Sequence, residues 1–224
     1  MGSDNQPKVR QLRRKATKDG QRATYKRILI VTEGSKTEPL YLEEISAMYR
    51  LQSANVQVSP SQLGTEPIQV VQYARELFEK GDLLRGIRSK CFDQVYAVFD
   101  RDDHKTYFNA LKSASALDGK LRNDDRQAVS FKAIASIPSF ELWLLLHYED
   151  IQAPIHRDEV MDRLKQHITG YDKGAGGAFA ITRDRLETAT QQAQALAQKF
   201  NAYTDPEPFT ALHELVMLLT TLRA

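Results

Sequence analysis

The sequence contains very little cysteine, since Cys91 is the only one among its 224 residues. A single cysteine excludes a disulfide within the chain and a zinc site built from several thiolates. Long hydrophobic stretches are also missing. Apolar runs such as 142–146 fall far short of the roughly 20 residues that cross a bilayer, and the N-terminus lacks the apolar core of a signal peptide. We therefore expect a cytoplasmic protein that makes no membrane contact.

The sequence has no large net charge either, because 31 Lys and Arg residues face 29 Asp and Glu residues, a balance of +2. The positive charge is uneven: residues 1–26 are strongly basic and contain only Asp4 and Asp19 as acids. We predict a disordered N-terminal arm there. Such an arm either keeps the protein soluble or contacts the phosphates of a nucleic acid, and its composition suits both roles.

Apolar, β-branched segments alternate with amphipathic ones through residues 27–150. The first kind predicts buried strands at 27–32, 56–58, 94–99 and 131–136, and the second predicts helices at 38–49, 66–80, 107–114 and 140–148. This alternation predicts an α/β domain with a central parallel sheet flanked by helices. Residues 151–224 show no strand signal, and we expect them to form a helical C-terminal extension, with helices at 158–167, 182–200 and 211–222 and a Gly-rich stretch at 170–177.

Acidic residues directly follow two of the predicted strands: Glu33 follows the first, and Asp100 and Asp102 follow the third. Ligands of open parallel sheets bind outside the carboxyl ends of the strands, so we expect these acids to meet. In an extended Asp-x-Asp both side chains point the same way. Three carboxylates without a Cys or His cluster suit Mg²⁺ or Mn²⁺. The alternative is a surface ion-pair cluster in which Arg101 neutralises its two neighbours.

Two further acids lie where a metal ligand or a helix-capping group is equally expected. Glu141 follows the Pro138 turn at the start of a predicted helix, with Ser139 as a candidate N-cap, and we include it among the metal ligands. Glu38 has the same ambiguity, with Thr37 as its candidate cap.

Three other side chains near these acids have different expected roles. Lys36 lies in the loop that should face the metal, where its ammonium could stabilise charge on a cleaved phosphate, so we include it in the catalytic set. His104 follows the acidic cluster, but a lone loop histidine is more often structural, and we leave it out. Trp143 lies in an almost wholly apolar segment and is expected in the core.

Three segments resemble one known family, the RloB family: 28–39, 98–103 and 139–147, with Pro208-Phe209-Thr210 similar to its closing motif. The resemblance implies a Toprim-like, Rossmann-like fold in which Glu33 is the Toprim glutamate and Asp100 and Asp102 bind Mg²⁺. It further implies a role in abortive-infection defence against bacteriophage beside an RloA-like ATPase of the AAA or ABC type. Any ATP hydrolysis must come from such a partner, because the chain contains no Gly-x-x-x-x-Gly-Lys-[Ser/Thr] loop.

These observations together favour a Mg²⁺-dependent nuclease that hydrolyses phosphodiester bonds in DNA or RNA as the effector of a defence system. The main alternative is a regulatory subunit that binds nucleic acid and the ATPase without cutting. A phosphoryl or nucleotidyl transferase is a third class, because Asp-x-Asp also binds metal-nucleotide. The sequence leaves open the substrate, the number of metal ions and whether the protein forms a homo-oligomer.

Overall fold

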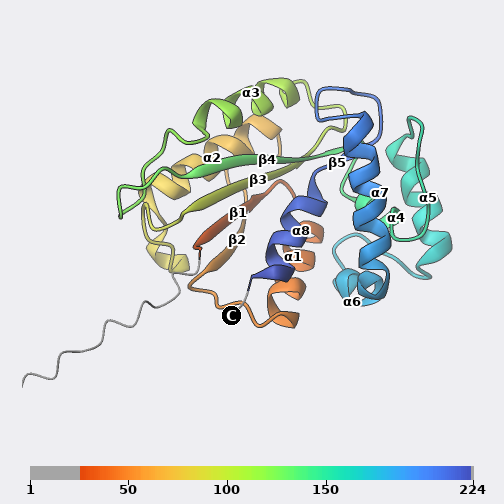
Figure 1. Ribbon diagram of the computed structural model, residues 1–224, viewed down its shortest axis with the longest axis horizontal. Coiled ribbons are helices and arrows are strands. Elements are labelled where there is room, and N and C mark those ends of the chain that lie inside the picture. The colour runs from red at the N-terminus through yellow and green to blue at the C-terminus, as the bar shows by residue number, and fades with distance from the viewer. Residues whose placement is uncertain (1–25, 223–224) are drawn as a thin grey trace, which may run out of the picture.

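The computed structural model describes residues 26–222, so all of the basic arm except Lys26 lies outside the described residues. A five-stranded sheet in the order β2-β1-β3-β4-β5 forms the centre of the molecule (Figure 1). The first four strands are parallel and the fifth is antiparallel to β4. The strands are β1 (Ile28–Thr32), β2 (Val56–Pro60), β3 (Gln94–Asp100), β4 (Ser130–Ile137) and β5 (Phe209–Thr210).

The two central strands are buried on both faces, as their uninterrupted apolar sequences predict. Every residue of β1 is buried, and so is every residue of β3 after Gln94. Helices cover both sides of the sheet (Figure 1): α2 (Pro67–Lys80) and α3 (Tyr107–Leu117) pack on one face, whereas α1 (Thr37–Met48) and α8 (Leu212–Thr221) lie on the other. The predicted α/β, Rossmann-like class with a mainly parallel sheet is confirmed.

A second group of helices lies beyond the carboxyl ends of the strands, at the right of Figure 1. It consists of α4 (Glu141–Leu145), α5 (Arg157–His167), α6 (Ala178–Thr182) and α7 (Leu186–Lys199), with the short 3₁₀ turn η2 (Arg183–Arg185) before α7. Another 3₁₀ turn, η1 (Leu83–Arg85), follows α2. Trp143 is fully buried, as expected, and its indole N–H donates to the hydroxyl of Tyr41 at 2.7 Å.

The expectation of no strand after residue 150 was wrong, because β5 joins the sheet edge. It pairs with the end of β4, Thr210 opposite Ser136 and Phe209 opposite Ile137, and the two hydroxyls of the first pair lie 3.0 Å apart. Two residues are too few to show the alternating pattern of a strand. The segment after Pro208 becomes a strand only because it pairs with β4. The segment after residue 150 therefore contributes directly to the sheet.

The helix predicted for 140–148 is shorter than expected. After Leu145 the chain tightens into i→i+3 turns, in which the amides of His147 and Tyr148 donate to the carbonyls of Leu144 and Leu145. Neither of the two candidate N-caps occupies that position. Thr37 is the first residue of α1, which has no side-chain cap, and Ser139 lies one residue before the N-cap position of α4.

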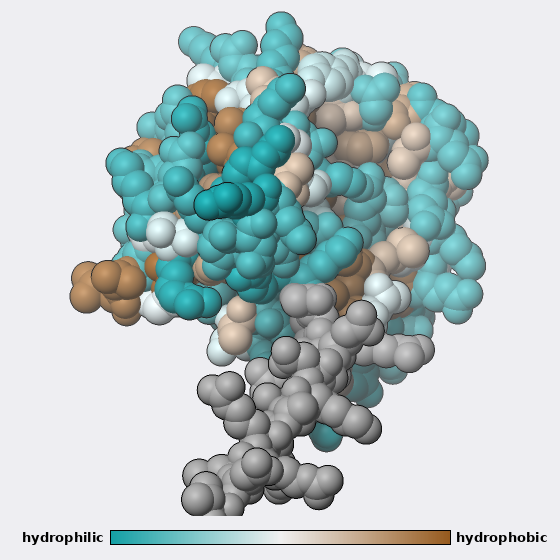
Figure 2. Space-filling model, turned by 60° about the vertical axis from the view of Figure 1, so that its left-hand side comes forward, coloured by the Kyte–Doolittle hydropathy of each residue, from teal (hydrophilic) through white to brown (hydrophobic). Residues whose placement is uncertain are grey.

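The face shown in Figure 2 is mainly hydrophilic, with hydrophobic residues in small, separate groups. The most exposed large hydrophobic side chains of the described part are Leu83 and Leu84 in η1, at 86% and 101% exposure. Within residues 26–222, no helix is both long and apolar enough to cross a membrane.

Candidate functional site

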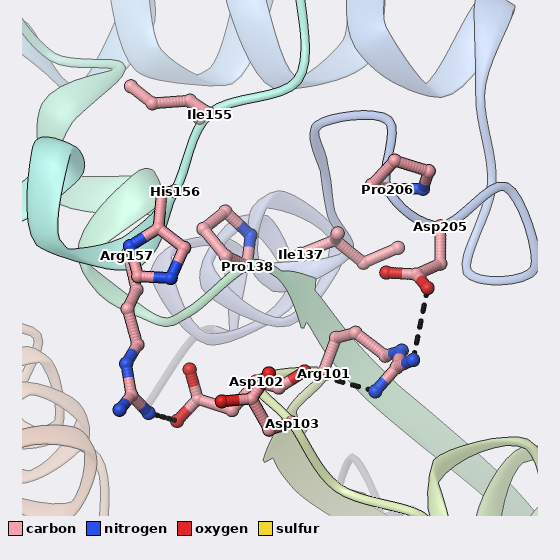
Figure 3. Close-up of a pocket in the computed structure, with 10 residues that line it drawn as sticks. All are labelled: Arg101, Asp102, Asp103, Ile137, Pro138, Ile155, His156, Arg157, Asp205 and Pro206. Carbon is pink, nitrogen blue, oxygen red and sulfur yellow. Dashed lines mark hydrogen bonds and ion pairs between the residues drawn. The ribbon is translucent and has the colours of Figure 1, made fainter.

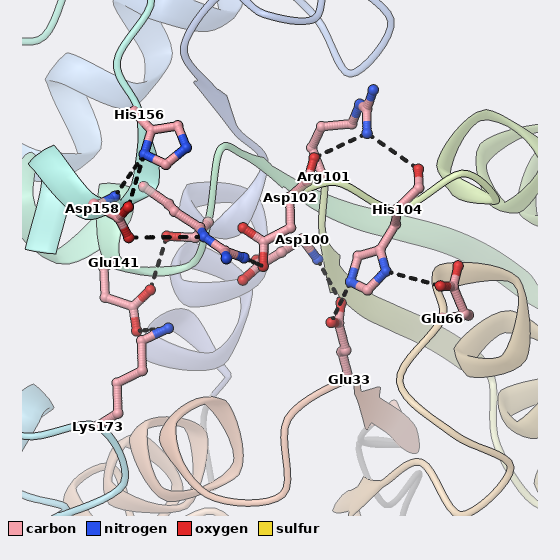
Figure 4. A network of polar contacts seen from close by, with 12 residues as sticks. Glu33, Glu66, Asp100, Arg101, Asp102, His104, Glu141, His156, Asp158 and Lys173 are labelled. Carbon is pink, nitrogen blue, oxygen red and sulfur yellow. Dashed lines mark hydrogen bonds and ion pairs between the residues drawn. The ribbon is translucent and has the colours of Figure 1, made fainter.

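Glu33 and Asp100 meet at the carboxyl edge of the parallel sheet (Figure 4). Glu33 follows β1 directly, and Asp100 is the last residue of the neighbouring strand β3. The Glu33 amide continues the ladder by donating to the Val98 carbonyl at 2.9 Å. The Glu33 carboxylate then accepts a hydrogen bond from the Asp100 amide at 2.9 Å. Pairing between the two strands therefore brings both acids together.

Asp102 reaches the same edge from a turn, and the extended geometry expected for residues 100–102 was wrong. Its φ is +33°, in the left-handed region that Asp tolerates better than most residues, and its amide donates to the Pro138 carbonyl at 3.0 Å. One carboxylate oxygen forms an ion pair with Arg157 at 3.1 Å. The other, Oδ1, is buried and has no hydrogen-bond partner among the described residues.

Glu141 and Glu38 are the two acids for which the sequence leaves open a cap or a site role, and both are buried. Glu141 opens α4 and accepts a hydrogen bond from the Ser139 hydroxyl at 2.8 Å. Glu38 lies in the first turn of α1, directly against Gly34: a Cβ at Gly34 would lie 2.2 Å from Glu38 Oε2. Glycine at this position therefore lets the Glu38 side chain lie across the loop that carries Glu33.

Asp100 carries the strongest electrostatic perturbation of the cluster. Its side chain is buried, which raises its pKa well above the usual range, and the negative charges of Glu38, Glu33 and Glu141 raise it further. Burial also raises the pKa of Glu33, and it raises that of Glu38 to about 7. Within residues 26–222, no cation forms an ion pair with Asp100 or Glu38, so no ion pair directly offsets the effect of burial on these two carboxylates.

Three basic side chains surround the cluster without entering its centre. In Figure 4, the Glu141–Lys173 pair lies on one side and the Glu33–His104 pair on the other, at 3.0 Å and 2.9 Å. Burial lowers the pKa of His104, but the neighbouring carboxylates outweigh it and the net shift is upward. Arg157 pairs with a third acid, Asp102. No three acidic, His or Cys side chains of the described chain are arranged to hold a metal ion.

The donor chemistry of the cluster nevertheless suits a hard divalent cation. Its candidate ligands are all carboxylate oxygens, the donor type that Mg²⁺ and Mn²⁺ prefer. Asp100 lies among other acids, and the buried Oδ1 of Asp102 has no hydrogen-bond partner in the part of the chain that the structure describes. An oxygen atom buried without a donor costs free energy that a cation at this position would recover.

Lys36 does not join the cluster. It is exposed, and within residues 26–222 no ion pair connects it to an acid. Its aliphatic stem instead lies against Gly174, where φ is +78° and an added Cβ would lie 2.7 Å from the Cβ of Lys36. The lysine that reaches the acids is Lys173, the residue before that glycine.

Sequence reasoning missed Lys173 and Arg157, and it set aside His104. Lys173 lies in the Gly-rich stretch, and Arg157 is the first residue of α5, so both come from the predicted C-terminal extension. His104 contacts Glu33 and also Glu66, whose carboxylate lies 3.3 Å from its Nδ1. His104 was marked only by its position directly after the acidic cluster. Lys173 and Arg157 carry no local signal of their contacts, because residues so far apart along the chain meet only after folding.

A protein-family model described as RloB-like protein matches residues 28–219. The match begins at β1 and ends within α8, so it includes both the sheet and the helices beyond its carboxyl edge. No curated protein and no solved structure matches the chain.

Proposed function

Since the chain belongs to the RloB-like protein family, we propose that it is a metal-dependent nuclease that hydrolyses phosphodiester bonds of DNA or RNA. The observation that carries this proposal is the buried Asp100, which lies among Glu33, Glu38 and Glu141 where open α/β sheets bind their ligands. A glutamate after the first strand and an Asp-x-Asp after the third is also the Toprim pattern that the family resemblance implies. The positions of Glu33, Asp100 and Asp102 at this edge of the sheet support the proposed nuclease function.

Glu33, Asp100, Asp102 and Glu141 would hold Mg²⁺ or Mn²⁺. When bound, such an ion supplies Lewis-acid polarisation of the phosphate and lowers the pKa of an attacking water. Because His104, Arg157 and Lys173 now contact three of the acids, metal binding requires some of these contacts to open or to turn toward the substrate.

Arg157 and Lys173 would bind the phosphates of the substrate, the role that the sequence suggested for Lys36. Their side chains are 47% and 57% exposed, although each contacts an acid of the cluster. A guanidinium carries five N–H donors and an ammonium carries three, so both have donors left for phosphate oxygens. The basic arm of residues 1–26 would add an electrostatic contact that depends on salt concentration.

The decisive experiment is cleavage of labelled single-stranded and double-stranded DNA and RNA with Mg²⁺, with Mn²⁺ and with EDTA. We expect Asp100→Asn and Glu33→Gln to lower the rate at least about a hundredfold, because metal-ion catalysis contributes several kcal/mol and each ~1.4 kcal/mol is tenfold. The matched control is Asp93→Asn, which removes a carboxylate directly before the other end of β3. Undiminished cleavage by both site variants, or in EDTA, would contradict the proposal.

A second candidate is a regulatory subunit that binds nucleic acid and an RloA-like ATPase without cutting. It is favoured by the three contacts with His104, Arg157 and Lys173 that already occupy Glu33, Asp102 and Glu141. The two candidates differ when the ATPase is present. A latent nuclease gains Mg²⁺-dependent cleavage with the ATPase and a phage component, whereas a binding subunit co-purifies with the ATPase but never cleaves. In either case the proposed setting is phage defence in the bacterial cytoplasm.

A further inference from the structure

A small cavity of about 220 Å³ lies immediately beside the acids, at Asp102. It is enclosed by the turn after β3, the end of β4, the start of α5 and the loop before β5 (Figure 3). Its lining residues are Arg101, Asp102, Asp103, Ile137, Pro138, Ile155, His156, Arg157, Asp205 and Pro206. The cavity shares Asp102 and Arg157 with the proposed catalytic site, so a ligand inside it is next to the reacting phosphate.

The cavity has an apolar floor and a polar edge. In Figure 3, Ile137 and Pro138 lie between His156 on one side and Pro206 on the other, with Asp103 below them. Flat aliphatic and ring surfaces suit a planar group, and a few polar groups at the rim fix its orientation. The ion pair between Arg101 and Asp205, at 3.0 Å, holds one wall in place.

We propose that this cavity receives one unpaired nucleobase of the substrate, next to the phosphate that is cleaved. This inference rests on the proposed nuclease function and names the form of its substrate. Pockets for drug-sized ligands measure roughly 300–1,000 Å³, and the cavity is smaller. It therefore takes one base and excludes a base pair. A base can enter only from a single strand or after leaving its stack.

Asp103 determines which bases fit. Its side chain is exposed at the rim, and no ion pair or hydrogen bond occupies its carboxylate within residues 26–222. A carboxylate accepts hydrogen bonds but cannot donate them. It therefore favours bases with an exocyclic amino group, such as cytosine, and disfavours uracil, which presents a carbonyl oxygen at the same position.

Arg157 connects the cavity to the acids. It lines the cavity and also pairs with Asp102, and its remaining donors are available to the phosphate attached to the bound base. The base and phosphate of one nucleotide can thus be held at the same time.

The test measures binding of short single-stranded oligonucleotides in EDTA by fluorescence anisotropy, so that no cleavage occurs. For the wild-type protein, an oligonucleotide with one abasic position should bind about tenfold more weakly than the intact one, because stacking of one base is lost. Ile155→Trp fills the cavity and should abolish this difference. Ile181→Trp is the matched control, because Ile181 is 54% exposed on α6 and does not line the cavity.

Base preference is tested with the same oligonucleotide carrying cytosine or uracil at that position, and with free CMP and UMP. We expect cytosine to bind about tenfold more tightly than uracil. This preference should disappear in Asp103→Ala and persist in Asp184→Ala, a control in which an 87% exposed carboxylate is removed. The wild-type comparisons hold even if Ile155→Trp fails to fold.

The possible outcomes separate this inference from the proposed nuclease function. Mg²⁺-dependent cleavage without any effect of the abasic position or of base identity would overturn the base pocket and leave the nuclease intact. An abasic effect that Ile155→Trp removes, in a protein that never cleaves, would support the pocket and overturn the nuclease. Binding of free CMP without binding of the oligonucleotide would identify a free-nucleotide site and contradict the inference.

Discussion

Acidic side chains cluster at both ends of the sheet. At one end a cation pairs with the acids, and at the other end the central acid lies among like charges. At the amino end, the guanidinium of Arg27 contacts Asp93 at 3.0 Å, Asp124 at 2.9 Å and Asp125 at 3.0 Å. At the carboxyl end, Asp100 lies among other acids, and the cations contact only the periphery of the cluster.

The pKa values of two residues of the β3 region express this difference. Burial alone would raise the pKa of Asp93, but hydrogen bonds and charge from Arg27 outweigh it and the net shift is downward. The pKa of Asp100 is raised, because burial and the neighbouring carboxylates act in the same direction. A group of several acids therefore does not by itself mark a functional site. What marks the site is a shortage of cations that contact those acids.

The largest effect on stability should follow from the loss of Arg27. We expect Arg27→Met to lower the free energy of unfolding by about 2–3 kcal/mol, because three carboxylates at the amino end lose their shared cation. Urea unfolding monitored by circular dichroism measures this change. Arg88→Met, at an exposed position, should cost less than about 0.5 kcal/mol. Equal losses in the two variants would show that the amino-end cluster does not stabilise the fold.

Asp93→Asn and Asp100→Asn should change the free energy of unfolding at pH 7.5 in opposite directions, each within the roughly 0.5–3 kcal/mol that single substitutions usually produce. The lowered pKa of Asp93 means that its carboxylate stabilises the fold above its unfolded pKa and that this contribution is lost on acidification. Asp93→Asn therefore destabilises, and the difference from wild type shrinks toward pH 3.

The raised pKa of Asp100 means that its ionisation opposes folding at pH 7.5. Asp100→Asn therefore stabilises, and the gain shrinks as the pH falls toward 4, where the unfolded carboxyl also becomes protonated. Unfolding curves of both variants between pH 3 and 8 provide the measurement. Shifts of the same sign would refute the contrast between the two ends.

Addition of Mg²⁺ should raise the thermal stability of the protein, and only by binding to the acids at the carboxyl end of the sheet. At ten times its Kd the ion contributes about 1.4 kcal/mol, which corresponds to a rise in Tm of about 3–6 °C for a chain of this size. Differential scanning calorimetry should show the rise in the wild type and in Asp93→Asn, and should not show it in Asp100→Asn. A rise that persists in Asp100→Asn would place the ion elsewhere.

The smallest effect should come from Lys173→Met, at less than about 1 kcal/mol. The Lys173 side chain is 57% exposed, so water already screens its charge, and the buried Glu141 carboxylate keeps the Ser139 hydroxyl as a donor after the substitution. Thermal unfolding measures the change, and Lys199→Met is a suitable control because Lys199 lies on α7 and hydrogen-bonds to Gln152 rather than to an acid. A loss of stability as large as that of Arg27→Met would contradict the contrast between Arg27, which pairs with three acids, and Lys173, which pairs with one.

Much of the sheet was predictable because its signals are local. The run that becomes β1 has apolar side chains throughout, which a strand requires when helices cover both faces. The meeting of Glu33 and Asp100 follows from that, since parallel neighbours end at the same edge. The strand β5 was not predictable, because two residues gain strand geometry only from the backbone of Ser136 and Ile137.

The cations around the acids could not be read from the sequence either. Lys36 is close to Glu33 along the chain, yet its stem lies against Gly174 and Lys173 contacts Glu141 instead. Nearness along the chain does not determine where a long side chain ends, because loop conformation decides its direction.

The sequence alone determined the class of the fold and the strand ends at which Glu33 and Asp100 lie, because hydrophobic patterning along each strand is a local property. Only the tertiary structure decided that Asp100 is buried among like charges, that Arg157 and Lys173 return from the C-terminal segment to the acids, and that a cavity opens beside Asp102. Burial, charge balance and enclosed space depend on segments far apart in the chain, so they exist only after the chain has folded.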